Sequence, residues 1–571
     1  MRTQMKISLL ALAIMSINAS AQDKAQEVNT TNNERPALRL PQSDTSPARR
    51  IERQAVIAPQ RETDVEMRTF DGSNNNINNA EMGSTGIQLR RLTFADYGDG
   101  VSTLAGENRR SPREISNIVF TQSHEQYNGK GATDFLWQWG QFLDHDIDLT
   151  VGVSPSEHED ISVPAGDIYF DPDSTGTVTM SFNRSIYDTN SGTNASNPRQ
   201  QLNEITAWID ASNVYGSSQE RAQALRTLDG TGKLKTSAGN FLPFNEEGLP
   251  NAGGNGSNLF LAGDVRANEQ VGLTAMHTLF VREHNRIASN IAQRNPGLSD
   301  EEIYQRARKM VTAEIQVITY KEFIPMLLGR DALRPYSGYK PNVEAGIANE
   351  FSTAAYRLGH SLLSPEIQRL DANFNVIANG NLSLRSAFFA PQEILENDID
   401  SILRGLASQR CQGVDTYVID DVRNFLFGEP GNGGFDLVSL NIQRGRDHGL
   451  PSLNDARQAL GLPRYTSFAQ VTSKPDLRQR LASAYKNVND IDLWVGGLAE
   501  NKFPGAMVGE TFFRILRHQF EALRDGDRFW YENDLNQEQI ARVEETSLSR
   551  VIRQNTNVGA ELQRNVFKVR R

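Results

Sequence analysis

Beyond about residue 110, the apolar residues of this chain recur mainly at the three- and four-residue spacing of an α-helix. The clearest run lies over 273–292, where Met276, Leu279, Phe280 and Ile287 share one face. A stripe of this kind predicts a helix that buries this face against a core. The pattern therefore favours a mainly helical protein.

A second helix is predicted from its start signal. Ser299 followed by Glu302 forms a capping box, which opens a helix that we expect to run to Leu328 and to stop at Gly329. Strand signals are short and scattered, as in 417–419, and no internal repeat follows residue 110. The simplest architecture is one large, mainly α domain with little β structure.

Residues 1–21 have the features of a secretory signal peptide. A positively charged start precedes an apolar run over 7–17 and small residues over 19–21, so we expect cleavage before Gln22. Residues 22–65 are polar and lack an apolar period, which predicts a leader or pro-region. No other stretch has the roughly 20 apolar residues of a membrane-spanning helix, so no transmembrane segment is expected.

Composition narrows the classes of protein. The chain has 571 residues, of which 38% are hydrophobic, enough for a large core. Its single cysteine excludes an intramolecular disulfide, so packing, a cofactor or metal ions must stabilise the fold. The net charge of −11 argues against nucleic acid or an anionic membrane surface as a partner. The charges are spread along the sequence, as on an ordinary solvated surface.

The segment 135–146 carries unusual polarity on an otherwise apolar helix. Gln141 and His145 are four residues apart and share one face, while Asp144 and Asp146 flank the histidine. Buried polar groups cost free energy unless they have partners, so a helix without a chemical task rarely carries so many. The alternative is a polar helix end at the surface, which further segments make less favourable.

A second segment predicts a cation site. Side-chain oxygens of Thr206, Asp210 and Ser212 fall at even positions, and Trp208 can offer its backbone carbonyl. Calcium takes six to eight oxygen ligands of these kinds, and Asp146 can add a further carboxylate. Read alone, the same residues describe a polar turn with local hydrogen bonds.

Three more segments combine polar residues with glycine. The loop over 261–270 leads into the helix of 273–292 and carries Arg266 and Glu269. The alternative is an ordinary N-terminal helix turn, where the helix dipole stabilises acidic side chains. In 356–360, His360 follows a glycine, but a lone histidine is more often a core residue than a ligand. The segment 440–451 is dense in polar groups and ambiguous by itself.

Together and in this order, the five segments closely resemble the animal-type haem peroxidase superfamily, which includes myeloperoxidase, lactoperoxidase and peroxidasin. The resemblance runs from about Met67 to about 528–530, most of the chain. It implies a large, single-domain, mainly α haem peroxidase fold over 66–571. Ser73 stands where a cysteine often precedes Asn-Asn, and the usual disulfides are absent, which favours a bacterial member.

The resemblance implies catalytic and iron-binding roles. His145 matches the distal histidine, Gln141 its neighbour in the haem cavity, and Arg266 the distal arginine. His360 matches the proximal ligand of the haem iron. Asn441 matches the residue that accepts a hydrogen bond from the other ring nitrogen of His360, a contact that orients the ligand.

The resemblance also implies further contacts to haem b and a calcium ion. Arg357 lies near a haem propionate, and Asp144 and Glu269 match the carboxylates that form ester bonds to haem methyl groups. Gln270 replaces the methionine that forms a third, sulfonium link, so that link is expected to be absent. The residues that match the calcium site are Asp146, Thr206, Trp208, Asp210 and Ser212.

The implied function is that of an exported peroxidase, which reduces hydrogen peroxide and oxidises halide or pseudohalide ions or small aromatic donors. A neutral His145 can take a proton from peroxide and return it to the leaving oxygen. Arg266, always cationic, stabilises the negative charge that develops. Without the sulfonium link, we expect a preference for bromide, iodide or thiocyanate over chloride.

Two alternatives remain. A fatty-acid oxygenase of the same superfamily places a radical-forming tyrosine three residues before the proximal histidine; here that residue is Arg357, and Tyr356 is one residue further away. A calcium-stabilised binding protein would keep the fold without the activity. The intact His145, Arg266 and His360 argue against it.

Other reactive residue types are expected to be structural. His277, His284 and His448 match no haem-ligand position of the family. A buried histidine in such a setting is usually a core residue with hydrogen-bond partners. Cys411 lies in no recognisable reactive motif, so we expect an isolated, inert thiol.

Overall fold

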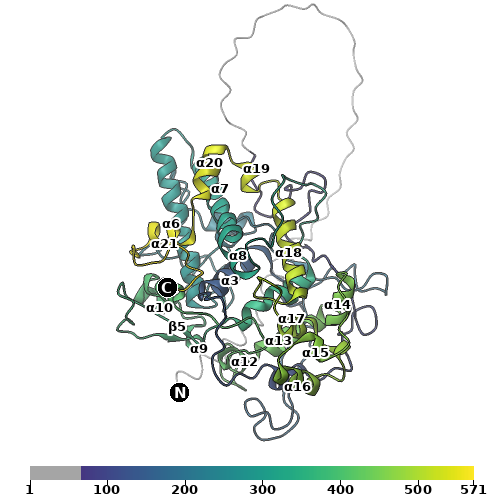
Figure 1. Cartoon of the computed structure of the whole chain (residues 1–571). Coiled ribbons are helices and arrows are strands. Elements are labelled where there is room, and N and C mark those ends of the chain that lie inside the picture. Colours follow the sequence, from purple (N-terminus) through teal and green to yellow (C-terminus); the bar gives the residue numbers. More distant parts are fainter. Residues whose placement is uncertain (1–65, 571) are drawn as a thin grey trace, which may run out of the picture.

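The computed structural model describes residues 66–570, most of which form helices or the loops between them (Figure 1). The longer helices are α2 (Pro112–Val119), α3 (Phe135–Ile147), α6 (Val271–Arg294), α7 (Asp300–Ile318), α10 (Pro391–Asn397), α11 (Asp400–Ser408), α13 (Leu437–Asp447), α14 (Leu453–Ala459), α16 (Pro475–Ala484), α17 (Leu493–Ala499), α18 (Glu510–Asp525), α20 (Gln537–Glu544) and α21 (Leu548–Asn555). The shorter turns are α4 (Ser212–Tyr215), α5 (Gln219–Ala224), α8 (Ile324–Leu327), α9 (Leu384–Ala387), α12 (Asp420–Arg423), α15 (Phe468–Val471), α19 (Tyr531–Asp534), η1 (Thr319–Phe323), η2 (Phe351–Ala355), η3 (Tyr356–Ser361) and η4 (Val488–Asp490).

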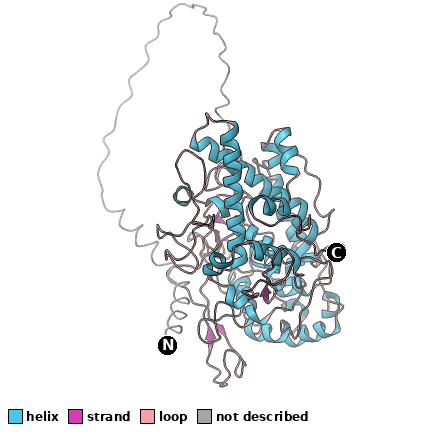
Figure 2. Ribbon diagram, turned by 90° about the vertical axis from the view of Figure 1, so that its left-hand side faces the viewer, coloured by secondary structure: helices cyan, strands magenta, loops and turns pink. Residues whose placement is uncertain are grey.

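Strands are few, and Figure 2 shows them as small patches between helices. Within residues 66–570 they form three antiparallel two-stranded sheets. These pair β1 (Ile87–Gln88) with β4 (Leu202–Asn203), β2 (Ile161–Ser162) with β3 (Thr179–Met180), and β5 (Glu366–Ile367) with β6 (Leu382–Ser383). In register, Ile87 faces Asn203, Ile161 faces Met180 and Glu366 faces Ser383. The prediction of a mainly α fold with little β structure is confirmed.

The strand predicted over 417–419 is wrong. The backbone N–H of Tyr417 donates to Oδ1 of Asp415 at 2.9 Å, which closes a turn. The next residue, Val418, donates its N–H to the carbonyl of Phe120 at 3.2 Å, at the end of α2. A turn on one side and a helix end on the other leave no neighbouring strand to pair with.

The two helices predicted from local signals are both present. α6 spans Val271–Arg294 and extends the predicted run at both ends. α7 starts at the predicted capping box, in which Ser299 and Glu302 bond to each other's backbone. It continues through the π-helical turn η1 into α8, and Gly329 follows with φ +103°. Both helices lie in the upper part of the molecule, beside α20 (Figure 1).

The core encloses α3. Trp139 and Phe142 are fully buried on this helix, and Phe142 stacks on Phe280 of α6 with ring centroids 5.1 Å apart. Trp139 packs against the same ring at 5.9 Å. Buried aromatic pairs of this kind fix the position of a helix strongly. α3 is therefore a rigid support for the polar residues at its C-terminal end.

A buried carboxyl at the start of α3 makes stability depend on pH. Asp134 is 1% exposed, and Ser364 donates to its Oδ1 at 2.7 Å. Burial raises its pKa to about 8, while Ser364 opposes the shift. The raised pKa keeps the proton in the folded state, so stability falls as pH rises from about 4 to about 8, by at most about 1.4 kcal/mol per pH unit.

We expect Asp134→Asn to keep the bond from Ser364 and to remove this dependence. The variant should match the original protein near pH 4 and become progressively more stable than it toward pH 8. Denaturant unfolding at several pH values measures the difference, with Asp173→Asn, at an exposed position, as the control for losing one carboxyl. Equal stability differences at pH 5 and pH 8 would contradict the expectation.

Two regions fall outside the described residues. The predicted signal peptide, 1–21, and the polar leader, 22–65, both lie there, so these remain expectations. In the part of the chain that the structure describes, no helix is long and apolar enough to cross a membrane.

Candidate active site

The end of α3 and the loop before α6 bring a histidine and an arginine onto one carboxylate. His145 is 4% exposed, and its Nδ1 lies 3.5 Å from Oδ1 of Asp264 without making a hydrogen bond to any described residue. Arg266 donates from Nε to Oδ1 of Asp264 at 2.8 Å and from Nη2 to Oδ2 at 2.9 Å. His145 and Arg266, predicted as the distal pair, therefore lie side by side.

Asp264 is a functional candidate that the sequence patterns did not indicate. Its side chain is 1% exposed and also accepts the backbone N–H of Arg266 at 2.8 Å. The only local signal is a Gly-Asp turn two residues before the arginine, and aspartate is common in turns. Arg266 is further fixed because its Nη2 donates to the carbonyl of Asp148, the residue after α3, at 2.9 Å.

The electrostatics of this group favour a neutral histidine beside a permanent cation. Burial lowers the pKa of His145 well below its ordinary value, Arg266 lowers it further, and Asp264 only partly opposes them. Burial alone would raise the pKa of Asp264, but Arg266 and His145 hold it below the usual range. A neutral imidazole can accept a proton, which a protonated one cannot do.

Two further carboxyls, Asp144 and Glu269, lie on this site. Oδ2 of Asp144 is 3.7 Å from Nη1 of Arg266, and Gln141 donates from Nε2 to Oε2 of Glu269 at 3.2 Å. Burial and then Asp148 raise the pKa of Asp144 to about 8, and burial raises that of Glu269 to about 7. The side chain of Asp144 nevertheless keeps 30% of its surface exposed, so it borders open space.

Gln270 occupies the position next to Glu269. Its Nε2 donates to Oε1 of Gln138 at 2.7 Å and to Oε1 of Gln141 at 3.0 Å, and its own Oε1 accepts the N–H of Gly272 at 2.6 Å. The side chain thus caps α6 and ties it to α3. An amide without sulfur has no atom that could form a sulfonium.

His360 lies in η3, which packs against α3. Burial, with a further contribution from Arg357, lowers the pKa of His360 to about 3, so the ring is neutral and suited to bind a metal. Its Nδ1 is 2.7 Å from Nδ2 of Asn441, a fully buried residue of α13. The predicted contact between these two side chains is present.

The direction of this contact differs from the prediction. The amide nitrogen of Asn441 faces the ring because its Oδ1 accepts a bond from Nη1 of Arg357 at 3.1 Å. A ring that binds iron through Nε2 carries its hydrogen on Nδ1 and needs an acceptor there. A half-turn of the amide supplies that acceptor, provided that Arg357 finds another anionic partner.

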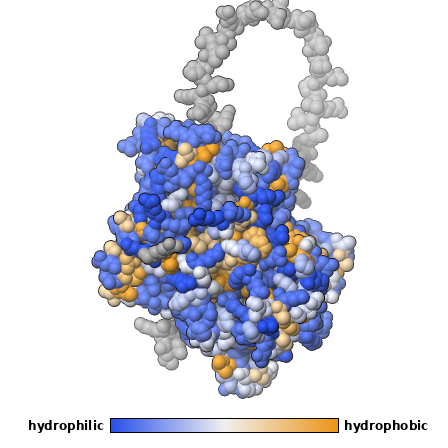
Figure 3. All heavy atoms as spheres, in the orientation of Figure 1, coloured by the Kyte–Doolittle hydropathy of each residue, from blue (hydrophilic) through white to orange (hydrophobic). Residues whose placement is uncertain are grey.

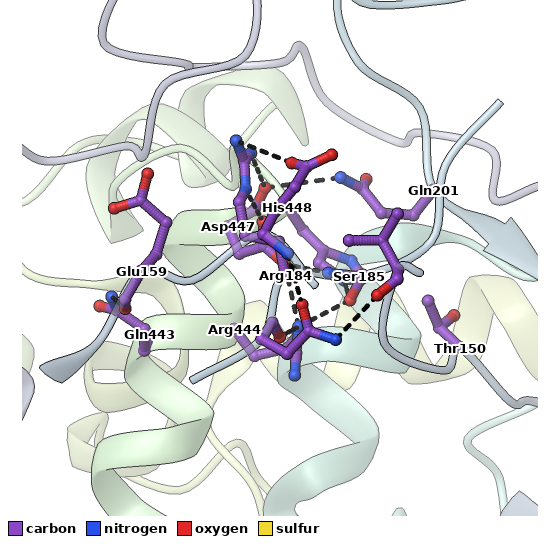
Figure 4. A network of polar contacts seen from close by, with 12 residues as sticks. Thr150, Glu159, Arg184, Ser185, Gln201, Gln443, Arg444, Asp447 and His448 are labelled. Atoms are coloured by element: carbon purple, nitrogen blue, oxygen red, sulfur yellow. Dashed lines mark hydrogen bonds and ion pairs between the residues drawn. The ribbon is translucent and has the colours of Figure 1, made fainter. Parts of the chain in front are cut away.

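Several polar side chains of the segment 440–451 hold α13 in place. Asp447 accepts bonds from Nε of Arg184 at 2.6 Å and from Nη1 of Arg444 at 2.9 Å, and Nε2 of His448 lies 2.7 Å from Oγ of Ser185 (Figure 4). All five side chains are buried or partly buried. This network fixes the helix that carries Asn441, which agrees with a structural role for His448.

The remaining residues expected to be inert are also buried. His284 contacts the hydroxyl of Tyr215 at 2.9 Å and the carbonyl of Gly232 at 2.9 Å. His277 packs against Phe142, with ring centroids 5.1 Å apart. Burial raises the pKa of the Cys411 thiol well above its usual range, which keeps it protonated and unreactive.

The groups gathered here fit a haem. His360 offers a neutral imidazole, and a Cβ built on the adjacent Gly359 would meet no atom within 4 Å, so the chain leaves open space at Gly359. Arg266 and Arg357 supply two cations for an anionic cofactor. Nδ1 of His145 is buried and has no hydrogen-bond partner among residues 66–570.

The predicted calcium ligands also lie together. Asp146 and Asp210 are at most 1% exposed, and Ser212 contacts both: its Oγ donates to Oδ1 of Asp146 at 3.1 Å and its N–H to Oδ1 of Asp210 at 3.0 Å. Oγ1 of Thr206 lies 3.1 Å from both carboxylate oxygens of Asp210. Trp208 is fully buried and donates to the carbonyl of Gly72 at 3.0 Å.

This donor set fits a hard cation. Burial raises the pKa of Asp146 well above its ordinary value, and the nearby Asp210 raises it further. Two buried carboxyls facing each other can both ionise only if a cation stands between or beside them. Within the described residues no group of three or more His, Cys, Asp or Glu side chains could hold a metal, so hydroxyl and carbonyl oxygens would complete the shell.

Comparison with known proteins identifies the family. The profile of the animal haem peroxidases matches residues 67–567. The chain belongs to the animal haem peroxidase family. It is 37% identical over 527 residues to peroxinectin A of Dictyostelium discoideum. The matched region covers 88% of this chain and 96% of that protein. It is also 37% identical to the human peroxidasin homolog, of which it spans only 37%.

Solved structures agree. Peroxidase A from Dictyostelium discoideum superposes with a TM-score of 0.82 at 35% identity, covering 88% of this chain and 99% of that one. The protein is therefore a haem peroxidase, and the predicted family and fold are confirmed. A fatty acid alpha-dioxygenase from Arabidopsis thaliana has a TM-score of 0.75 at 21% identity, which shows a shared fold alone.

Proposed function

We propose that His145 and Arg266 of this haem peroxidase activate hydrogen peroxide, and that the enzyme oxidises small anions or small aromatic donors. The observation that carries the proposal is the pairing of a neutral histidine and a cationic arginine on one buried carboxylate, Asp264. When bound, haem supplies the redox chemistry that accepts two oxidising equivalents from peroxide and passes them to the donor.

The chain's own residues handle the proton and the charge. The neutral ring of His145 takes the proton from one peroxide oxygen and returns it to the oxygen that leaves. Arg266, fixed by Asp264 and by the carbonyl of Asp148, stabilises the negative charge that develops on the leaving oxygen. His360 would hold the iron, and Asn441 would orient its ring.

Asp264 is expected to act as a positioning residue. Asp264→Asn keeps the shape but removes the charge that holds Arg266 and faces His145, so kcat/KM for peroxide should fall about 10- to 100-fold. Steady-state kinetics measures this, with haem content determined on the same sample. Asp173→Asn, at an exposed position, is the control for charge. An unchanged kcat/KM for Asp264→Asn would show that the carboxylate does not position the pair.

We further propose that Asp144 and Glu269 form ester bonds to haem. Both are partly buried carboxyls whose raised pKa values indicate an environment suited to neutral esters. After turnover with peroxide, acidic acetone should leave haem on the original protein, release part of it from each single variant, Asp144→Asn and Glu269→Gln, and release nearly all from the double variant. Complete release from the original protein would refute the links.

The donor is proposed to be bromide, iodide, thiocyanate or a small phenol, with chloride a poorer substrate. The support is Gln270, which has no sulfur for a third link and instead bonds to Gln138 and Gln141. Halide and phenol turnover on the haem-loaded enzyme tests this. Chloride as the best substrate would reject the preference, and oxygen uptake with unsaturated fatty acids would favour the oxygenase alternative.

We also propose that calcium occupies the site of Asp146, Thr206, Trp208, Asp210 and Ser212. Its support is the pair of buried carboxyls, of which Asp146 directly follows His145. The ion would thereby hold the C-terminal end of α3 and the catalytic histidine in place. Export through the predicted signal peptide remains a proposal.

A further inference from the structure

A basic hollow of about 270 Å³ lies where α6, α7, α20 and α21 meet, away from the active-site residues. Five arginines line it, on a protein whose net charge is −11. So many like charges in one hollow repel each other, and a bound anion would relieve the repulsion. The five are Arg286, Arg294, Arg306, Arg542 and Arg550.

Three of these guanidinium groups are unpaired. Arg294, Arg306 and Arg542 make no side-chain hydrogen bond or ion pair with any residue of the described chain. By contrast, Arg286 pairs with Glu283, and Arg550 lies 3.4 Å from Glu545. Since arginines on protein surfaces commonly pair with acids, three free ones around one hollow point to a ligand that is itself anionic.

The single acid of this hollow does not cancel the charge. Glu314 is 7% exposed and its Oε2 has no partner among the described residues. Burial and then the neighbouring Glu283 raise its pKa well above its ordinary value, which disfavours a negative charge at this position. A protonated carboxyl can donate a hydrogen bond to an anion.

The hollow continues into two neighbouring ones, of about 510 and 820 Å³. The first shares Arg550 and Gln554 with it, and the second shares Arg286 and Gln554. We call the three joined hollows the basic groove; its hydrophilic surroundings near α20 and α6 appear blue in Figure 3. The two neighbours add five cations, Arg553, Arg564, Lys233, Lys235 and Arg282, and two acids, Glu322 and Asp398. Of these cations, Arg282 pairs with Asp398 and Lys235 pairs with Glu247.

The other residues of the basic groove indicate the chemistry of the ligand. No aromatic side chain lines any of the three hollows, so the groove lacks the stacking surface that single-stranded nucleic acids use. Amides such as Asn290, Gln539 and Gln554 also line the central hollow and can bond to sugar hydroxyls. Arginine forks match sulfate and phosphate oxygens.

We propose that the basic groove binds an extended saccharide chain that carries sulfate or phosphate groups. The free arginines of the central hollow bind its anionic groups, and the two neighbouring hollows bind the chain on either side. This site would hold the peroxidase on an anionic polysaccharide while leaving the active site free. The proposal does not depend on the residue roles proposed for catalysis.

The test measures binding of a sulfated, heparin-derived hexasaccharide to the haem-loaded, full-length enzyme by titration calorimetry. The double variant Arg306→Gln/Arg542→Gln should bind at least tenfold more weakly. The control variant Arg330→Gln/Arg514→Gln removes the same charge at two exposed positions elsewhere and should bind within twofold of the original. By the counterion-release argument, the slope of log K against log salt should be smaller by about 2 for the first variant alone.

Unchanged peroxidase turnover and melting temperature would show that the double variant is folded. Arg306→Lys/Arg542→Lys, which keeps the charge but loses the forks, should bind with intermediate affinity. A phosphorylated hexasaccharide in a parallel titration decides which anionic group is preferred; tighter binding of either supports the proposal. Equal affinity for the desulfated chain, for single-stranded DNA of matched charge or for inorganic phosphate would overturn it, as would equal binding by the glutamine and control variants.

Discussion

His145→Leu is expected to lower kcat/KM for hydrogen peroxide by about 10²- to 10⁴-fold, the range that general acid–base catalysis contributes. The substitution removes the ring that carries the proton from one peroxide oxygen to the other. Arg266 and Asp264 stay in place, so the residual activity should reflect charge stabilisation and binding alone. Rapid mixing with peroxide, followed by absorbance, measures the rate directly.

The matched control for this variant is His277→Leu. His277 is also buried, and its ring packs against Phe142, so it is a matched buried histidine with no proposed part in proton transfer. We expect its kcat/KM to stay within tenfold of the original. Both variants should bind haem normally, since His360 is intact, and imidazole added to His145→Leu should restore part of the rate. A loss below tenfold in His145→Leu would exclude it as the proton carrier.

Removal of calcium is expected to have the largest effect on stability. If calcium is present at about 100 to 1,000 times its Kd, its binding stabilises the folded enzyme by about 2.7–4.1 kcal/mol. Without the ion, the buried carboxyls of Asp146 and Asp210 disfavour each other's charge, and Arg68 and Arg308 offset only part of this cost at Asp210. A chelator should therefore lower the melting temperature, and added calcium should restore it.

Asp210→Asn sharpens the test because its effect on stability is expected to be opposite with and without calcium. In calcium, the variant should be less stable than the original, since one ligand is lost. In chelator, it should be more stable, since the repulsion within the buried pair is gone. Asp173→Asn, at an exposed position, should show neither change. The same melting temperature with and without calcium, for the original protein, would contradict a structural ion.

Local signals allowed much of the fold to be predicted. The capping box at Ser299 and the apolar stripe of α6 depend on residues within one or two helical turns, so both helices were recognisable. The prediction over 417–419 failed for the opposite reason. Apolar β-branched residues need a partner strand, and the neighbour here is the end of α2.

The site was predictable only where the resemblance named its residues. Asp264 escaped because its role depends on two side chains from different elements meeting on one carboxylate. The direction of the contact between Asn441 and His360 likewise depends on Arg357, which competes for the same amide oxygen. Such competition is set by three-dimensional packing and leaves no trace in residue spacing.

The basic groove also could not be predicted from the sequence. Along the sequence the charges are evenly spread, which predicts an ordinary solvated surface. Folding brings the arginines of α6 and α7 beside those of α20 and α21, which are distant in the sequence, and forms the basic groove. Net charge alone therefore describes the average surface and says little about a local binding site.

The most direct test of the central claim is the absorption spectrum of the haem-loaded enzyme before and after one equivalent of hydrogen peroxide. We predict a Soret band that shifts on peroxide addition and returns when bromide or a phenol is added. In His360→Ala the band should be lost or strongly altered, while His145→Leu should keep the band and respond far more slowly. A protein that binds no haem when haem is supplied, or a Soret band that peroxide leaves unchanged, would contradict the account.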